Sequence, residues 1–242
     1  MSTLRSPKIT VIGAGGLGCP ALYALGPELA ARDARVVIVD DDRVDLSNLQ
    51  RQILHRTADV GRLKVDSAEE ALAARFPALA VQARALRVGR ENARAVVAGS
   101  DVVLDGTDSI EAKFLINDAC VLERVPLVHG GVLRFSGQLL SVLPGQACYR
   151  CLFEAPPPPE AAPSCQEAGV LGAVCGLLGA LMAEEALAIL DGKPALGSTL
   201  LVIDALSGER RRIKIKPRPD CQVCGAHPTI TSLDLHREAA AC

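Results

Sequence analysis

The sequence predicts an α/β protein built on a Rossmann-like, mostly parallel sheet with helices on both faces. Three observations carry this prediction. A short apolar run at residues 9–12 leads directly into the glycine motif GAGGLG, residues 13–18, which fits the G-x-G-x-x-G pattern between a strand and a helix. A second apolar run, residues 36–39, is followed by Asp40. Strand-like and helix-like segments then alternate as far as residue 132, which is typical of a parallel sheet.

The elements of the first half follow from local pattern. Short apolar runs bounded by turn residues predict strands at residues 9–12, 36–39, 80–86, 101–104 and 127–132. Apolar residues at helical spacing predict a helix after the glycine motif and further helices at residues 64–75, 91–98 and 110–123. The pair Gly26-Pro27 is expected to kink or end the first helix, because proline removes a helical hydrogen bond.

The second half loses this alternation. It predicts later antiparallel strands at residues 138–143, 199–204 and 211–215. Four consecutive prolines within residues 154–164 indicate an extended, exposed crossover loop. The apolar run at residues 168–190 contains Glu184 and Glu185, which favours a buried helix over a membrane span.

Length and composition narrow the class of protein. At 242 residues we expect one domain over residues 1–242, with a nucleotide-binding part at 1–135 and a second part at 136–242. The net charge of −2 gives no general attraction to nucleic acid or an anionic membrane. Aromatic residues make up only 2%, which disfavours base stacking. A short polar start without a signal peptide, together with nine cysteines, predicts the reducing cytoplasm.

The chemistry is expected to centre on residues 40–52, DDDRVDLSNLQRQ. Asp40, at the end of the second strand, is placed to accept hydrogen bonds from a ribose hydroxyl. Arg51 can offer a planar, permanently charged fork to phosphate, and Asn48 can bind a polar ligand beside Gln52. An ordinary polar loop is the alternative. A nicotinamide cofactor would fit the glycine motif and Asp40 equally well.

Two further charged residues suit a phosphate site. Lys64 starts a predicted helix, where it opposes the helix dipole unless an anion shares the position; a solvated surface lysine is the alternative. Asp105 and Asp108 follow the strand at 101–104, at the edge where open α/β sheets bind ligands. Asp108 is a candidate for holding a magnesium ion, or it caps the following helix.

The cysteines include a set with metal-ligand spacing. Two C-x-x-C pairs supply four thiolates that suit a structural zinc ion, namely Cys148, Cys151, Cys221 and Cys224. A redox pair or buried thiols are the alternatives. Cys165 lies between the proline-rich loop and a helix, so it is a candidate for a covalent role or a passive loop cysteine.

These motifs occur in an order that is specific to one family. GAGGLG, DDDRVDLSNLQRQ, GRLKVDSA, DGTDS, CYRCLF, SCQEAGV and CQVCG follow one another between Lys8 and Leu233. The chain therefore resembles the adenylyltransferases that activate ubiquitin-like sulfur carriers, the ThiF/MoeB/HesA group of relatives of the ubiquitin-activating enzyme. This resemblance implies that a carrier's C-terminal Gly-Gly carboxylate attacks the α-phosphate of MgATP, releasing pyrophosphate and leaving an acyl-adenylate.

The resemblance also implies roles for matching residues. Those that would surround ATP are Gly15, Gly16, Asp40, Asn48, Arg51, Gln52 and Lys64. Arg51 and Lys64 would offset the charge that builds on the leaving pyrophosphate. Asp108 would hold Mg²⁺, and Cys165 matches a cysteine that some members bond covalently to the carrier. Residues 136–242 would then carry the carrier-binding surface, the crossover loop and the zinc site.

The same resemblance implies ATP, Mg²⁺ and Zn²⁺ as cofactors, a homodimer, and a separate sulfur donor, because no rhodanese-like extension follows Cys224. Three positions depart from the family pattern. Arg5 is a poor match for an N-terminal arginine that reaches the partner subunit, Lys113 stands where arginine is common, and Ser136 where glutamate is common. These departures keep open a docking subunit that lacks its own chemistry. Adenylation of a peptide C-terminus is a further alternative.

Overall fold

The computed structural model describes residues 6–157 and 169–233, so Cys165 and Arg5 lie outside the described residues. In chain order its elements are β1 (Lys8–Ile12), α1 (Gly18–Ala31), β2 (Arg35–Asp40), η1 (Leu46–Asn48), η2 (Thr57–Asp59), α2 (Lys64–Arg75), β3 (Ala80–Ala85), α3 (Ala93–Val97), β4 (Val102–Asp105), α4 (Ile110–Glu123), β5 (Leu127–Leu133), β6 (Ser136–Val142), α5 (Tyr149–Leu152), α7 (Gly172–Leu190), β7 (Thr199–Asp204) and β8 (Arg210–Lys214).

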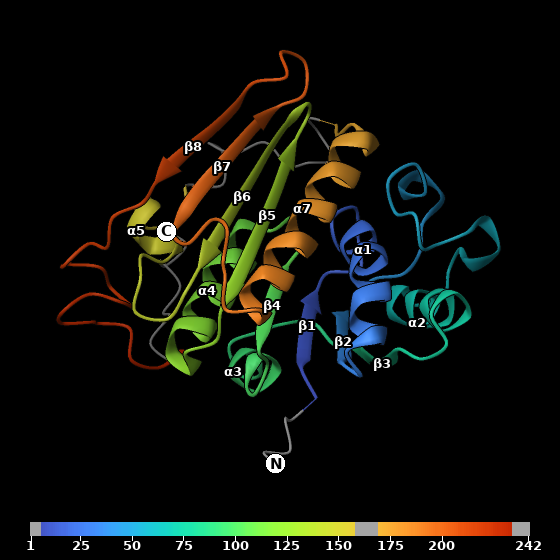
Figure 1. Cartoon of the computed structure of the whole chain (residues 1–242), viewed down its shortest axis with the longest axis horizontal. Coiled ribbons are helices and arrows are strands. Elements are labelled where there is room, and N and C mark those ends of the chain that lie inside the picture. The colour runs from blue at the N-terminus through green and yellow to red at the C-terminus, as the bar shows by residue number, and fades with distance from the viewer. Residues whose placement is uncertain (1–5, 158–168, 234–242) are drawn as a thin grey trace, which may run out of the picture.

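The strands of the described residues form one sheet in the order β3-β2-β1-β4-β5-β6-β7-β8 (Figure 1). The five strands from β3 to β5 pair in parallel. From β5 to β8 the pairing is antiparallel. The strand order reverses between β1 and β4, and ligands of open α/β sheets bind at the carboxyl ends of strands beside such a reversal. The predicted mixed sheet is confirmed.

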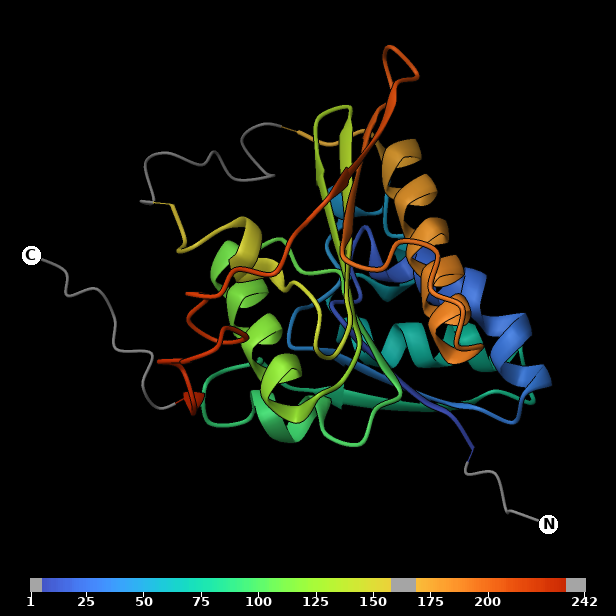
Figure 2. The same ribbon diagram turned by 60° about the vertical axis from the view of Figure 1, so that its left-hand side comes forward.

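Helices cover both faces of this sheet. Figure 2 shows α1, α2 and α7 on one side of the sheet and α3, α4 and α5 on the other. Each side has its own cluster of buried apolar residues, with Leu178 and Met182 of α7 in the first and Ile116 of α4 in the second. Both faces of the central strands are therefore buried from solvent, which explains the near-continuous apolar runs that predict β1, β2 and β4.

Helices α1 and α7 run side by side in the same direction. A Cβ atom on Gly179 would lie 2.5 Å from Cγ of Pro20, near the start of α1, so glycine is needed for this close approach. At the other end of the pair, Arg32 and Asp191 form an ion pair. Helix α7 is long and apolar enough to cross a membrane by length and composition. Its packing against α1 and the sheet is the buried arrangement that the sequence predicts.

Several predicted boundaries hold to the residue, including Lys64–Arg75, Ile110–Glu123 and Thr199–Asp204. Helix α1 does not end at Gly26-Pro27 but continues to Ala31, so of the two outcomes predicted for this pair only the kink stays a prediction. Gly26 has a packing reason instead. A Cβ atom at this position would lie 2.2 Å from the ring of Phe76.

Candidate nucleotide-binding site and cysteine cluster

The loop GAGGLG is a tight turn between β1 and α1. Gly13 has φ +94°, and its N–H donates to the carbonyl of Val39 at 2.8 Å. A Cβ atom on Gly18 would lie 1.8 Å from the carbonyl oxygen of Gly13, so only glycine fits there. No side chain caps α1 at Leu17. The N–H of Cys19 donates to the carbonyl of Gly15 at 3.0 Å and Pro20 has no N–H, so at the start of α1 the N–H of Gly18 is the one that can turn to a phosphate oxygen.

Asp40 lies beside this loop at the end of β2. Its Oδ2 accepts the N–H of Ala14 at 2.7 Å, and its Oδ1 accepts the N–H of Asp42 at 2.8 Å. Burial raises the pKa of the Asp40 carboxyl above its ordinary value, and the nearby charge of Lys64 opposes that shift. Each oxygen keeps a further lone pair, so the carboxylate can still accept a hydrogen bond from a hydroxyl group of a ligand.

Lys64, the first residue of α2, is only 6% exposed, so the alternative of a solvated surface lysine is wrong. Its Nζ donates to Oδ2 of Asp42 at 2.6 Å. Backbone hydrogen bonds hold it there, since the N–H of Lys64 donates to the carbonyl of Asp42 and that of Val44 to the carbonyl of Arg62. A cation is thus fixed beside Asp40.

Asn48, Arg51 and Gln52 lie on the other flank of the loop. Nη2 of Arg51 donates to Oδ1 of Asn48 at 2.6 Å. A Cβ atom on Gly16 would lie 3.1 Å from Cδ of Arg51, and one on Gly15 would lie 3.7 Å from Nε2 of Gln52. Because neither glycine has a side chain, the backbone of the loop can lie directly against Arg51 and Gln52.

Gln52 is the strongest sign that a ligand belongs here. It is 3% exposed, and among the described residues its Oε1 has no hydrogen-bond donor. A buried amide oxygen without a donor costs about 1–3 kcal/mol. A nucleotide, which carries hydroxyl and amino donors, would remove that cost, so the residues present fit a bound nucleotide.

Asp108 lies on the loop after β4, and its side chain is exposed. It does not cap α4, because Ser109 accepts the N–H of Ala112 at 3.2 Å and is the capping residue. The loop abuts the glycine motif: a Cβ atom on Gly13 would lie 3.0 Å from the carbonyl carbon of Gly106. Asp108 therefore faces solvent at the same edge of the sheet as the glycine loop.

One residue beside the loop was not anticipated from the sequence. His55 is buried, its Nε2 lies 3.0 Å from the carbonyl oxygen of Ala14 and its Nδ1 lies 2.9 Å from Oγ of Ser67. Burial lowers the pKa of His55 below its ordinary value. It ties the glycine loop to α2. Local spacing gave no signal for it, since its partners lie 12 and 41 residues away.

The four predicted zinc ligands come together. The Sγ atoms of Cys148, Cys151, Cys221 and Cys224 all lie within 4.8 Å of one another. Cys148 and Cys221 are 3.6 Å apart, and Cys151 and Cys224 are 3.4 Å apart. Zinc bound tetrahedrally at about 2.3 Å requires sulfur–sulfur distances of about 3.8 Å, so the cluster fits zinc. A hydrogen bond to Cys224, and then burial, raises the pKa of the Cys148 thiol; a divalent cation would favour the thiolates.

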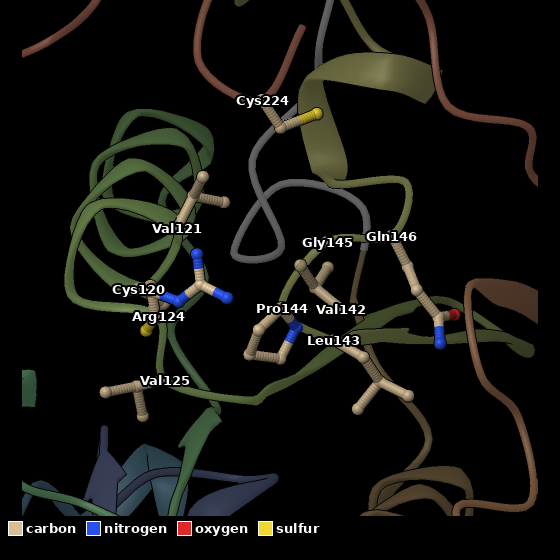
Figure 3. Close-up of a pocket in the computed structure, with 10 residues that line it drawn as sticks. All are labelled: Cys120, Val121, Arg124, Val125, Val142, Leu143, Pro144, Gly145, Gln146 and Cys224. Atoms are coloured by element: carbon tan, nitrogen blue, oxygen red, sulfur yellow. The ribbon is translucent and has the colours of Figure 1, made fainter.

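A buried ion pair anchors this cluster to α4. Nε and Nη2 of Arg150, which stands between the first two cysteines, both donate to Asp118 at 2.8 Å. The backbone N–H of Tyr149 donates to Oδ1 of Asn117 at 2.9 Å. A pocket of about 190 Å³ lies beside the cluster, between the end of α4 and the loop after β6 (Figure 3). The guanidinium of Arg124 points into it.

The chain matches a model of the ThiF family over residues 1–223. It is 44% identical over 234 residues to a sulfur carrier protein adenylyltransferase of Thermus thermophilus, covering 93% of this chain and 85% of that protein. It is 42% identical over 223 residues to the SAMP-activating enzyme E1 of Haloferax volcanii, covering 92% and 82%.

A third relative is longer. The adenylyltransferase and sulfurtransferase MOCS3 of Anopheles gambiae is 42% identical over 234 residues, which cover 95% of this chain and 52% of that protein, so the chain spans about half its length. Among solved structures, E. coli MccB with MccA-N7isoASN shares the fold, with a TM-score of 0.79 at 20% identity over 92% of this chain and 68% of that chain. On the family match and these identities, the chain belongs to the ThiF family.

Proposed function

We propose that this chain is an ATP-dependent adenylyltransferase that acts on the C-terminal glycine carboxylate of a ubiquitin-like sulfur-carrier protein. One observation carries the proposal. This chain, a member of the ThiF family, brings Asp40, Arg51 and Lys64 together around the glycine loop. Beside them lies Oε1 of Gln52, which has no hydrogen-bond donor among the described residues. Relatives at 42–44% identity are named for the activation of such carriers.

The chemistry asks mainly for positioning and charge. A carrier's carboxylate is already ionised at neutral pH, so no general base is needed before it attacks the α-phosphate. In this proposal the glycine loop and the start of α1 receive the phosphates, while Asp40 holds the ribose. Arg51 and Lys64 offset the charge that develops on the departing pyrophosphate. Each of the two cations is already held by a partner, Asn48 and Asp42 respectively.

Magnesium belongs to the same proposal. Asp108 would bind the ion, which would neutralise phosphate charge. The exposure of Asp108 at the carboxyl edge of β4, beside the glycine loop, supports this assignment. The four-cysteine cluster would hold zinc as a structural ion, because four protein ligands leave no open coordination position.

The remaining parts of the proposal concern organisation. Residues 1–135 would form the nucleotide-binding part and residues 136–242 the part that binds the carrier. We also propose a cytoplasmic homodimer that receives sulfur from a separate donor, with Cys165 as the candidate for a covalent bond to the carrier. Size-exclusion chromatography with light scattering would test the dimer. A Cys165→Ala variant that still forms the usual carrier–enzyme conjugate would remove Cys165 from the mechanism.

ATP–pyrophosphate exchange tests the central proposal. The purified chain is incubated with labelled pyrophosphate, MgATP and one candidate carrier ending in Gly-Gly at a time. We expect exchange that depends on the carrier and disappears in Asp108→Ala. Asp66→Asn, which alters an exposed carboxylate on α2, serves as the matched control. Bound ATP without exchange for any carrier would contradict the proposal and favour a docking subunit or a peptide substrate.

A further inference from the structure

Asp105 is a fully buried carboxylate at the end of β4 that the proposed chemistry does not use. Its Oδ1 accepts two hydrogen bonds from Thr107, from N–H at 2.9 Å and from the hydroxyl at 2.6 Å. Its Oδ2 accepts from Nδ1 of His129 at 2.7 Å and from Nζ of Lys113 at 3.2 Å. Four donors saturate the two oxygens, so the carboxylate has no capacity left for a ligand.

The charges around Asp105 keep it ionised. Lys113 comes from α4 and His129 from β5, and both side chains are buried. Burial opposes ionisation, yet Lys113 and then His129 hold the pKa of the Asp105 carboxyl below its ordinary value. Nζ of Lys113 also donates to the carbonyl of Gly130 at 2.6 Å. Two cationic or polar donors from different elements thus fix one carboxylate in place.

The imidazole of His129 makes no other hydrogen bond among the described residues. Its Nε2 is buried without a hydrogen-bond partner, and its ring lies 4.7 Å from that of Tyr149 between centroids. An unpaired ring nitrogen in the interior is a cost that an apolar residue at this position would avoid. The bond to Asp105 is therefore what the polar side chain of His129 provides.

The loop that Asp105 holds leads directly to Asp108. The same loop packs against the glycine motif, because a Cβ atom on Gly106 would lie 3.1 Å from the backbone nitrogen of Gly18. No hydrogen bond of the described residues restrains the Asp108 side chain itself. The backbone of residues 105–107 therefore sets where the Cα of Asp108 lies and which way its Cα–Cβ bond points. Restraint of that backbone comes from Asp105 on one side and from the glycine motif on the other.

We infer that Asp105 is a positioning residue, which, with Thr107, Lys113 and His129, aims Asp108 at the divalent cation of the bound nucleotide. This inference rests on the proposed function through the assignment of magnesium to Asp108. It adds a buried network that sets how tightly the cation binds, although none of its members touches the cation.

Thr107→Val tests the inference with little risk to folding. Valine keeps the shape of threonine and removes the hydroxyl donor to Asp105, whereas the control Thr107→Ser retains that donor. Mn²⁺ replaces Mg²⁺, and its binding to the protein–ATP complex is followed by electron paramagnetic resonance. We expect Thr107→Val to raise the Mn²⁺ concentration at half-saturation about tenfold, because mutating a residue that orients a metal ligand typically weakens metal binding by this factor or more. Thr107→Ser should stay within about twofold, and metal-free ATP binding should be unchanged in both.

A second pair addresses His129. Asparagine can present an N–H near the position of Nδ1, so His129→Asn should bind Mn²⁺ more tightly than His129→Leu. A lower melting temperature in Thr107→Val with unchanged Mn²⁺ binding would overturn the inference, because Asp105 would then only stabilise the fold. Unchanged Mn²⁺ binding in Asp108→Ala would overturn both the inference and the magnesium assignment. Normal Mn²⁺ responses without carrier-dependent exchange would overturn the proposed function alone.

Discussion

Replacing Arg150 with methionine should destabilise this protein more than most single substitutions. Arg150 is 6% exposed and Asp118 is fully buried. The guanidinium also donates to the carbonyl of Glu154 at 3.0 Å, and its carbon lies 4.8 Å from the ring centroid of Phe114. Methionine fills part of the space but removes the three hydrogen bonds that Arg150 donates to the Asp118 carboxylate, to which the amide of Asn117 also donates at 3.0 Å.

The magnitude follows from the burial of the pair. Removing one partner of a buried ion pair costs about 3–5 kcal/mol, because the other charge is left uncompensated. For a chain of this size, each kcal/mol lowers the melting temperature by about 2–4 °C. Arg150→Met should therefore lower the melting temperature by roughly 6–20 °C. The exposed pair between Arg32 and Asp191 provides the contrast, since Arg32→Met should cost less than about 1 kcal/mol.

Thermal unfolding followed by circular dichroism measures these effects, with the metal content of each variant determined first. The double variant Arg150→Met with Asp118→Asn removes both charges and should recover most of the loss. A melting temperature for Arg150→Met within about 2 °C of the unaltered chain would refute the reasoning. A double variant that is no more stable than Arg150→Met would also refute it, because the lost stability would then come from lost packing and not from the buried charge of Asp118.

Three further predictions concern the site and the cysteine cluster. Gly16→Ala should weaken ATP binding severalfold, as measured by isothermal titration calorimetry, because the added Cβ would press on Cδ of Arg51. The control Gly176→Ala on α7, where a Cβ atom would meet open space, should bind ATP normally. Equal affinities of the two variants would show that the loop has room for a Cβ atom. Burial lowers the pKa of His55, so as the pH falls below about 6.5 the unfolded chain takes up a proton at this residue before the folded chain does. The contribution of His55 to stability should therefore be full above that pH and decline below it. The variant His55→Gln should show a flatter dependence of melting temperature on pH. Removing zinc with a chelator should lower the melting temperature and expose the thiols of the cluster, including Cys224, to a thiol reagent; an unchanged melting temperature would argue against a structural ion.

Local signatures explain what the sequence predicts well. The glycine motif needs only a strand, a tight turn and a helix, and the two C-x-x-C pairs each place two thiols on one short turn. The sequence predicts that they meet in space, 73 residues apart in the chain, because two such thiol pairs together make up the ligand set of a tetrahedral zinc site. These features depend on residues a few positions apart, so they can be recognised before the fold is known.

The buried hydrogen-bond networks around Asp105 and Asp118 could not be predicted from the sequence, because they depend on how strands and helices pack in the folded protein. Asp105 was expected at the ligand edge, yet its side chain turns into the protein, where His129, 24 residues later, meets it across the pairing of β4 with β5. Arg150 and Asp118 are 32 residues apart and meet because α5 packs on α4. Lys113 replaces a common arginine, but its single ammonium reaches both Asp105 and the carbonyl of Gly130. Which donor faces which acceptor is decided by strand and helix placement, which no local pattern encodes.

The late position of α7 in the chain affects how the protein can be synthesised. Leu178 and Met182 fill the space above Gly137 and Gly130, where a Cβ atom would lie within 2.1 and 2.4 Å of their side chains. Six strands, β1 to β6, thus leave the ribosome before the helix that covers them. A nascent chain that stops short of Gly172 exposes the apolar face of the sheet, so it should be held by chaperones or aggregate. Productive folding of the nucleotide-binding part must therefore wait for a segment encoded well beyond it.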